Sequence, residues 1–331
     1  MNAAWVIDMH AHVLHPDVQA ITINHCVATG YGARPRAARP EPGDPPYENF
    51  RRMTIPAVQI ADMDARGIDH ALISSSTVSQ STFWADAGLA AELDRTANEG
   101  IAEWVRAHPA RFSGAFTLPL QDLDRALAEL EFCVRRLGLR VVNLPAEIGG
   151  RYLGDPSLRP LWEAIDDLEI VAFLHPDGIK DPAFLRYSLW NGIGQGIEET
   201  RLMASLIYEG VLERHPDLRI VIAHAGGFLP FTIARLDRNA TAHPPSMANI
   251  TRKPSTFLRA FHYDTVTYDP VQVDFLAARV GVDRIVFGTD YPFGEREPRG
   301  LVEATRLDEA ERAAVFADNA RRLLGDATQP A

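Results

Sequence analysis

Four continuous apolar runs of the sequence each end abruptly in histidine or aspartate. In chain order they lead into His10 and His12, His175, His224, and Asp290. Runs of this kind are typical of strands that are buried on both faces in a parallel sheet. Barrel enzymes place their chemistry at the carboxyl ends of such strands. We therefore expect these five side chains to converge on one point.

Three imidazoles and one carboxylate are a donor set that suits Zn²⁺, and it also suits Mn²⁺, Fe²⁺ or Co²⁺. A single histidine at a strand end is more often a hydrogen-bonded core or turn residue, and Asp290 alone could cap a turn. A His-x-His pair is also weak evidence for a metal site by itself, because alternate residues of any strand share one face. The joint pattern is hard to explain by packing. It predicts that His10, His12, His175 and Asp290 hold a single ion.

Eight candidate strands alternate with helices along the chain. The strands are expected at 5–9, 70–74, 112–118, 139–144, 170–174, 219–223, 261–264 and 284–287. This alternation indicates a parallel sheet, and eight repeats predict a closed (β/α)₈ TIM barrel that spans residues 1–331 as one domain. A doubly wound sheet is the alternative fold. The first strand is not followed by Gly-x-Gly-x-x-Gly, so the dinucleotide-binding turn is missing.

Insertions are expected after the first, fifth and sixth strands. Residues 13–50 are rich in Pro, Gly and Arg, and we expect an irregular segment over the active face. Residues 177–196 form the second insertion. Residues 240–254 are polar and interrupted by Pro, which predicts a loop over the site. The tail at 325–331 is expected to fray.

Composition excludes several kinds of partner. The net charge is −11 and no basic stripe is present, which argues against nucleic acid. Two cysteines, Cys26 and Cys133, make no disulfide framework and suit a reducing cytoplasm. No apolar run approaches the roughly 20 residues of a membrane span. We expect a cytoplasmic enzyme that acts on a small molecule.

The motifs resemble the amidohydrolase superfamily, and within it the branch of aminocarboxymuconate-semialdehyde decarboxylase and related aromatic-acid decarboxylases, hydratases and hydrolases. The matching residues are Asp8-Met9-His10-Ala11-His12, His175-Pro176, Ala223-His224-Ala225-Gly226-Gly227 with Pro230-Phe231 and Arg235, and Gly288-Thr289-Asp290-Tyr291-Pro292-Phe293. They extend over nearly the whole chain. The pattern is specific for superfamily and branch, and much less so for substrate.

The resemblance implies a metal-dependent, non-oxidative decarboxylase, a lyase that acts on an aromatic or muconate-type carboxylic acid. In such enzymes a strand-six histidine, here His224, exchanges a proton with metal-bound water and returns it to the substrate; a fourth ligand is the alternative role for His224. Asp290 is expected to be both a ligand of the ion and a catalytic residue. A hydrolase or hydratase of a related acid or lactone is the alternative function, and a non-catalytic subunit of a hetero-oligomer is a third.

The resemblance also implies a binding site for a carboxylate substrate. Arg51 and Arg235 are the candidate arginines, with Arg52 competing for the first role, and Trp190 and Phe293 are candidate aromatic walls. In the resembled family the arginine that matches Arg235 serves a neighbouring subunit, which implies a homodimer or a higher homo-oligomer. Many superfamily members hold a second metal on a lysine at strand four. No lysine lies there in this chain, so we expect one ion, most often Zn²⁺, with Mn²⁺ as the other candidate.

Overall fold

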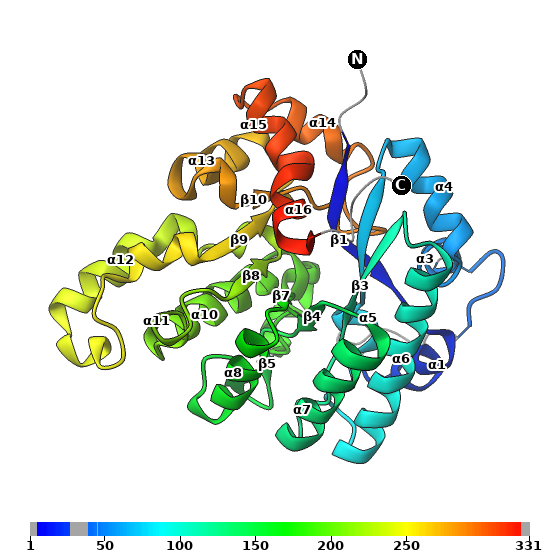
Figure 1. Cartoon of the computed structure of the whole chain (residues 1–331), viewed down its shortest axis with the longest axis horizontal. Coiled ribbons are helices and arrows are strands. Elements are labelled where there is room, and N and C mark those ends of the chain that lie inside the picture. The colour runs from blue at the N-terminus through cyan, green and yellow to red at the C-terminus, as the bar shows by residue number, and fades with distance from the viewer. Residues whose placement is uncertain (1–4, 27–38, 45, 326–331) are drawn as a thin grey trace.

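Eight parallel strands form the centre of the molecule in the computed structural model, which describes residues 5–26, 39–44 and 46–325 (Figure 1). In sheet order the strands are β1 (Ile7–Val13), β2 (His70–Ser75), β3 (Phe112–Phe116), β4 (Val141–Leu144), β7 (Val171–Leu174), β8 (Arg219–Ile222), β9 (Phe261–Asp264) and β10 (Ile285–Val286). A short antiparallel pair, β5 (Glu147–Ile148) and β6 (Arg151–Tyr152), follows β4. The predicted eight-stranded α/β architecture is confirmed.

The first and last strands meet and close the barrel. The amide of Met9 donates to the carbonyl of Phe287 at 2.8 Å, and that of His12 donates to the carbonyl of Tyr291 at 2.8 Å. A parallel bridge between Ala11 and Tyr291 lies between them. This closure brings the two ends of the sequence, and the site residues that they carry, to one edge of the barrel.

Inward-facing side chains of neighbouring strands fill the interior of the barrel. The inner cluster includes Met9, Leu72, Phe173 and Val286, all 0% or 1% exposed. Leu323 belongs to the same cluster, so the last helix packs against the end of the barrel away from the site. Because both faces of the strands are buried, apolar runs rather than alternating patterns encode them.

Helices surround the barrel in the expected alternation (Figure 1). They are α1 (Pro16–Thr22), α3 (Tyr47–Thr54), α4 (Pro56–Arg66), α5 (Thr77–Gln80), α6 (Ala87–Ala107), α7 (Leu123–Phe132), α8 (Arg159–Asp167), α9 (Leu189–Gly192), α10 (Gly194–Tyr208), α11 (Val211–Arg214), α12 (Leu229–Ala242), α13 (Pro270–Val280), α14 (Pro298–Glu303), α15 (Glu309–Ala313) and α16 (Asn319–Leu324). Local signals define their ends. Asp86 accepts from the amides of Gly88 and Leu89 at the start of α6, and Gly67, with φ of 64°, ends α4 as predicted.

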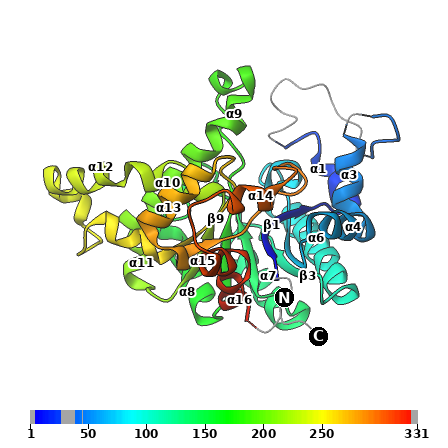
Figure 2. The ribbon, with the colours of Figure 1, turned by 90° about the horizontal axis from the view of Figure 1, so that it is seen from above.

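The first insertion is more regular than the sequence predicted. The prediction of an irregular segment over 13–50 is wrong for α1 and for the start of α3. Pro16 occupies the first turn of α1, where its fixed φ and missing amide proton suit a helix start. Residues 27–38 and 45 of this insertion lie outside the described residues. Figure 2 shows α9, in the second insertion, and α1 with α3 projecting on the same side of the barrel.

The segment after α12 does not cover the site, so the prediction of a loop over the site at 240–254 is wrong. The side-chain amide of Asn249 donates to the carbonyl of Tyr208, and the amide of Thr251 donates to Glu213. These partners belong to α10 and α11, which precede β8, because α12 carries the chain outward before it returns. Of the expected frayed tail at 325–331, all but Gly325 lies outside the described residues. None of the helices in the described ranges has the length and apolarity that a membrane crossing requires.

Candidate metal centre

The five predicted site residues meet at the carboxyl ends of four strands. Donor atoms of His10, His175, His224 and Asp290 all lie within 4.8 Å of one another. His12 reaches the same point, since its Nε2 is 3.2 Å from Nε2 of His10 and 3.0 Å from Oδ1 of Asp290. Ring centroids of His10, His12 and His175 are 4.9 to 5.0 Å apart. The convergence that the sequence predicted is present in the structure.

His10 is oriented by a buried carboxylate at the end of β9. Its Nδ1 donates to Oδ2 of Asp264 at 2.6 Å, which leaves the lone pair of Nε2 directed at the other histidines. Oδ1 of Asp264 accepts from the amides of Ala225 and Val266, both at 3.1 Å. Burial acts to raise the pKa of Asp264, but the hydrogen bond and charge of His10 outweigh it, so the pKa is lowered. A carboxylate behind the distal ring nitrogen is the usual support for a metal-binding histidine.

His175 is oriented in the same sense by a hydroxyl group. Its Nδ1 donates to Oγ1 of Thr77 at 2.8 Å, and the Thr77 hydroxyl donates onward to the carbonyl of Pro176. The Nε2 atom of His175 is buried and has no hydrogen-bond partner among the described residues. Burial and the neighbouring imidazoles lower the pKa of His175 well below its ordinary value. A neutral imidazole with a buried, unpaired nitrogen fits a metal ligand.

His224 has a different environment. Its Nδ1 contacts Oε1 of Glu199 at 2.6 Å, and Glu199 is fully buried on α10. Burial acts to lower the pKa of His224, but the charge and hydrogen bond of Glu199 outweigh it and raise the pKa to about 9. His224 therefore favours the imidazolium form, whereas burial lowers the pKa of His12 despite its hydrogen bond with Asp290. The two imidazoles differ in charge although both approach Asp290.

The backbone is strained at two of these positions. His224 has φ of 48° and Asp290 has φ of 55°, in the left-handed region that non-glycine residues seldom adopt. Such conformations cost about 1–3 kcal/mol each and persist where surrounding contacts fix them. Each turn redirects the chain at the end of a strand and aims the side chain at the centre.

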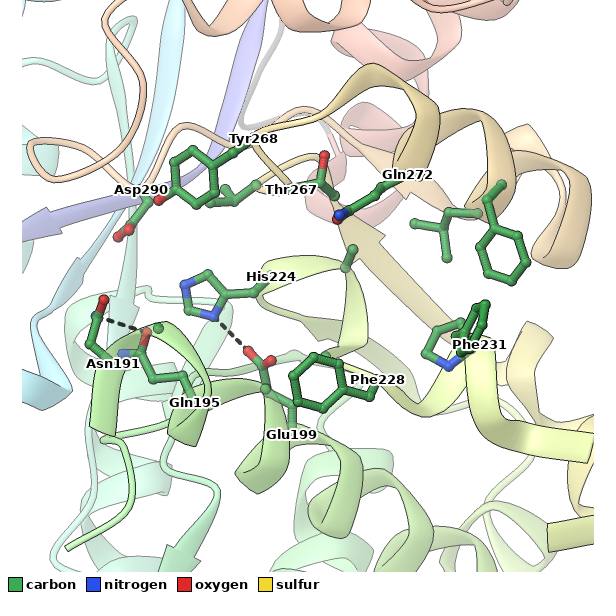
Figure 3. A pocket seen from close by; sticks show the side chains of 18 of the residues that line it. Asn191, Gln195, Glu199, His224, Phe228, Phe231, Thr267, Tyr268, Gln272 and Asp290 are labelled. Carbon is green, nitrogen blue, oxygen red and sulfur yellow. Dashed lines mark hydrogen bonds and ion pairs between the residues drawn. The ribbon is translucent and has the colours of Figure 1, made fainter. Parts of the chain in front are cut away.

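A cavity of about 640 Å³ opens beside the centre (Figure 3). His224 and Asp290 line its inner end, and Phe293 lies there with its ring centroid 6.0 Å from that of His12. The wall continues outward through side chains of α10, α12 and α13. Volumes of about 300–1,000 Å³ with mostly apolar walls and a few convergent polar groups are typical of small-molecule sites.

Of the four predicted substrate-binding residues, one lines the cavity and three lie outside its lining. Phe293 lines the cavity, as stated above. Trp190 packs against Gly178 and is outside the lining. Arg51 pairs with Glu48 at 3.1 Å on α3 and also lies outside it. Arg235 is exposed on α12, and its side chain makes no hydrogen bond or ion pair within the described part of the chain.

Sequence reasoning missed three supporting residues: Thr77, Glu199 and Asp264. Asp264 ends a predicted strand, and this position at a strand end is the one feature of the sequence that could have identified it. Thr77 and Glu199 lie on helices and reach the site only through the fold, and nothing in their local sequence marks them.

A parallel eight-stranded barrel with histidine and aspartate donors at the carboxyl ends of its strands defines a barrel enzyme with a candidate metal centre. The amidohydrolase family model matches residues 7–325. This chain therefore belongs to the amidohydrolase family.

Three similar proteins illustrate the relationship. The chain is 31% identical over 275 residues to a 2-amino-3-carboxymuconate-6-semialdehyde decarboxylase from Dictyostelium discoideum, with 82% of this chain and 76% of that one covered. It is 32% identical over 306 residues to a gamma-resorcylate decarboxylase from Rhizobium sp. (strain MTP-10005), with 85% and 91% covered. A dihydroxybenzoic acid decarboxylase from Polaromonas sp. JS666, crystallised with manganese and the inhibitor 2-nitroresorcinol, matches with a TM-score of 0.82, 26% identity and 97% and 96% coverage.

Replacing Thr77 with valine should weaken divalent-ion binding by about 10- to 100-fold, the usual effect of removing a group that orients a ligand. Valine keeps the shape of the side chain but cannot accept the proton of His175 Nδ1. Competition with a chelating dye measures the affinity. Thr96→Val is the matched control, because Thr96 bonds only its own helix on α6. Equal affinities for both variants would show that Thr77 does not support the site.

Proposed function

We propose that this protein is a metal-dependent, non-oxidative decarboxylase, a carboxy-lyase that acts on an aromatic or muconate-type carboxylic acid. The observation that carries the proposal is His224, a half-buried imidazole that faces the cavity beside the candidate metal centre and is held by Glu199. A residue in this position can deliver a proton to a carbon atom that has lost CO₂. The decarboxylase relatives described above support the same reaction class.

The proposed ligands are His10, His12, His175 and Asp290, for one divalent ion in each subunit. Their fit rests on the buried, unpaired Nε2 of His175, the lowered pKa of His175 and of His12, and the contact of the Asp290 carboxylate with His12. Zn²⁺ and Mn²⁺ are the two candidates, the first from the donor set and the second from the relative crystallised with manganese. When bound, such an ion polarises a substrate oxygen and stabilises negative charge that develops on the substrate.

His224 would act as the general acid. Glu199 holds Nδ1, so Nε2 is the atom left to face the cavity, and the raised pKa keeps a proton available there. When the bond between the ring carbon and the carboxylate breaks, its electron pair stays on that carbon and CO₂ leaves. The proton on Nε2 of His224 then forms the new C–H bond. Phe293 would pack against the substrate ring, and Trp190 is a second aromatic candidate behind Gly178.

The test of this function is the loss of CO₂ without O₂ or an organic cofactor. A panel of hydroxybenzoates, muconate semialdehydes and lactones is incubated with metal-loaded protein and followed by ultraviolet absorbance and mass. Loss of 44 mass units is the expected result, since CO₂ has that mass. Addition of water without that loss would instead identify the alternative, a hydratase or hydrolase that uses the same site residues.

His224→Ala should retain most of its metal but lose about 100-fold or more in turnover, the usual scale for a positioned acid–base group. His175→Ala is the matched comparison and should lose the metal, because it removes a proposed ligand. Elemental analysis of both purified variants, together with the wild type, gives the metal content. Comparable metal loss in the two variants would assign His224 as a ligand, and two tightly held ions in the wild type would contradict the mononuclear proposal.

We also propose a homodimer in which Arg235 binds the substrate carboxylate of the neighbouring subunit. Arg235 lies about two turns into α12, on an exposed part of the helix that also carries Phe231, which is 75% exposed. Its guanidinium group has no partner among the described residues, and a large exposed aromatic ring beside it suits an interface. Arg51 is a second candidate for the same carboxylate, although it would have to leave Glu48.

Mixing two inactive variants, Arg235→Ala and His224→Ala, tests the role of Arg235 across the interface. In a hybrid dimer one site receives an intact His224 and an intact Arg235, so after random exchange about a quarter of the wild-type activity should return. Arg238→Ala, at a second exposed arginine of α12, is the control and should stay active alone. Absence of recovery after proven subunit exchange, or a fully active monomer, would rule the role out.

A further inference from the structure

A tyrosine on the loop between β9 and α13 has a backbone conformation that bulky residues seldom adopt. Tyr268 has φ of 61°, in the left-handed region. Hydrogen bonds on both sides of it fix the loop. The hydroxyl of Thr265 donates to the carbonyl of Gly288 at 3.2 Å and accepts from its amide at 3.1 Å, and the carboxylate of Asp269 accepts from the amide of Val271 at the start of α13. Strain that surrounding contacts hold in place is typical of functional sites, so the position of this side chain requires an explanation.

The strained turn places the ring of Tyr268 at the inner end of the cavity. Tyr268 lines the cavity together with His224 and Asp290, and Figure 3 shows its ring next to Asp290. Burial and the negative charges of Asp290 and Asp264 raise the pKa of Tyr268, which indicates that both carboxylates are near. The side chain is nevertheless 55% exposed. A molecule that fills the inner end of the cavity would therefore contact this ring.

The hydroxyl group of Tyr268 is available to such a molecule. It makes no hydrogen bond within the described part of the chain. The neighbouring hydroxyl on the cavity wall, that of Thr267, already donates to the carbonyl of Asp269 at 3.0 Å. The raised pKa keeps the phenol of Tyr268 protonated, so it adds no negative charge beside the carboxylates and can donate to an anionic oxygen.

We propose that Tyr268 is a substrate-binding residue whose hydroxyl group donates a hydrogen bond to an anionic oxygen of the substrate at the inner end of the cavity. This inference rests on the proposed function, because it assumes that an acid binds there. The role is separate from that of Arg235, which would reach the substrate from the neighbouring subunit. His224 and Tyr268 contact the same molecule from two loops, one with a proton that it transfers and the other with a proton that it keeps.

Tyr268→Phe removes the hydroxyl group and keeps the ring. The probe is 2-nitroresorcinol, a coloured nitrophenol without a carboxylate, in its ionised form. Its dissociation constant from metal-loaded protein is measured by the change in visible absorbance. The substitution should weaken binding by about tenfold or more, the scale of one hydrogen bond to a charged group. An unchanged dissociation constant in the folded variant would overturn the proposal.

Tyr187→Phe is the matched control. Tyr187 is also an exposed tyrosine in the left-handed region, with φ of 59°, and it lies outside the cavity lining. This variant should bind 2-nitroresorcinol as the wild type does. An equal loss of affinity in both variants would show that the effect does not arise from a contact in the cavity, and the role of Tyr268 would be wrong.

Tyr268→Asn separates substrate binding from a purely structural role. Asparagine adopts the left-handed region more readily than tyrosine, so the thermal unfolding midpoint should not fall. Binding of 2-nitroresorcinol should weaken at least as much as in Tyr268→Phe, because the ring is lost as well. A lower midpoint together with wild-type affinity would show that the ring serves the fold, and would contradict the proposal.

Release of CO₂ from 2,6-dihydroxybenzoate is measured separately from binding. In Tyr268→Phe the value of kcat/KM should fall by about tenfold or more, in step with the weaker hydrogen bonding. CO₂ release with unchanged kcat/KM would refute the role of Tyr268 and leave the decarboxylase function standing. Weaker probe binding in Tyr268→Phe, combined with no CO₂ release by the wild type from any acid of the panel, would refute the function and leave the role of Tyr268 standing.

Discussion

The assembly of the site depends on one buried carboxylate, Asp8. Its Oδ1 accepts from the amides of His10 and Thr289, and its Oδ2 accepts from the Thr289 hydroxyl at 2.5 Å. These bonds join segments that lie 281 positions apart in the sequence, one with His10 and His12 and the other with Asp290. Burial raises the pKa of Asp8 to about 6. An apolar residue at this position would leave the amides of His10 and Thr289 unpaired, and the two halves of the donor set would lose their common anchor.

The site separates two tasks that the same side-chain type could perform. His10, His12 and His175 keep a ring nitrogen directed at the centre, and burial lowers the pKa of His12 and His175, so these two stay neutral. His224 lies about 5 Å away by ring centroids but gains a proton through Glu199. A cation repels an imidazolium and binds a neutral imidazole, so His12 and His175 suit a ligand role better than His224 does. The proposed ion site and the proposed proton donor can therefore lie next to each other.

The sequence predicted the barrel and the convergence of donors because both depend on local patterns. Strands buried on both faces are apolar runs, and His10 or Asp290 at the end of such a run is conspicuous. Thr77 and Glu199 could not be found in this way, since a threonine or a glutamate on a helix is ordinary until the fold brings it to His175 or His224. The short helix at 16–22 had a local signal in Pro16, which the high content of Pro, Gly and Arg around it obscured. The path of 240–254 depended on the length of α12, which turns and motifs do not encode.

The strained turn that carries His224 also affects which substitutions could stabilise this protein. Four successive residues there, His224 to Gly227, have positive φ, and the first two are not glycine. A more flexible residue at Ala225 would relieve strain and widen the range of positions open to the imidazole. Selection for thermal stability alone would therefore favour substitutions at this turn that loosen His224, the proposed proton donor. Stability and catalytic competence are opposed at this point of the fold, and a thermostable derivative of the protein is best sought in substitutions remote from it.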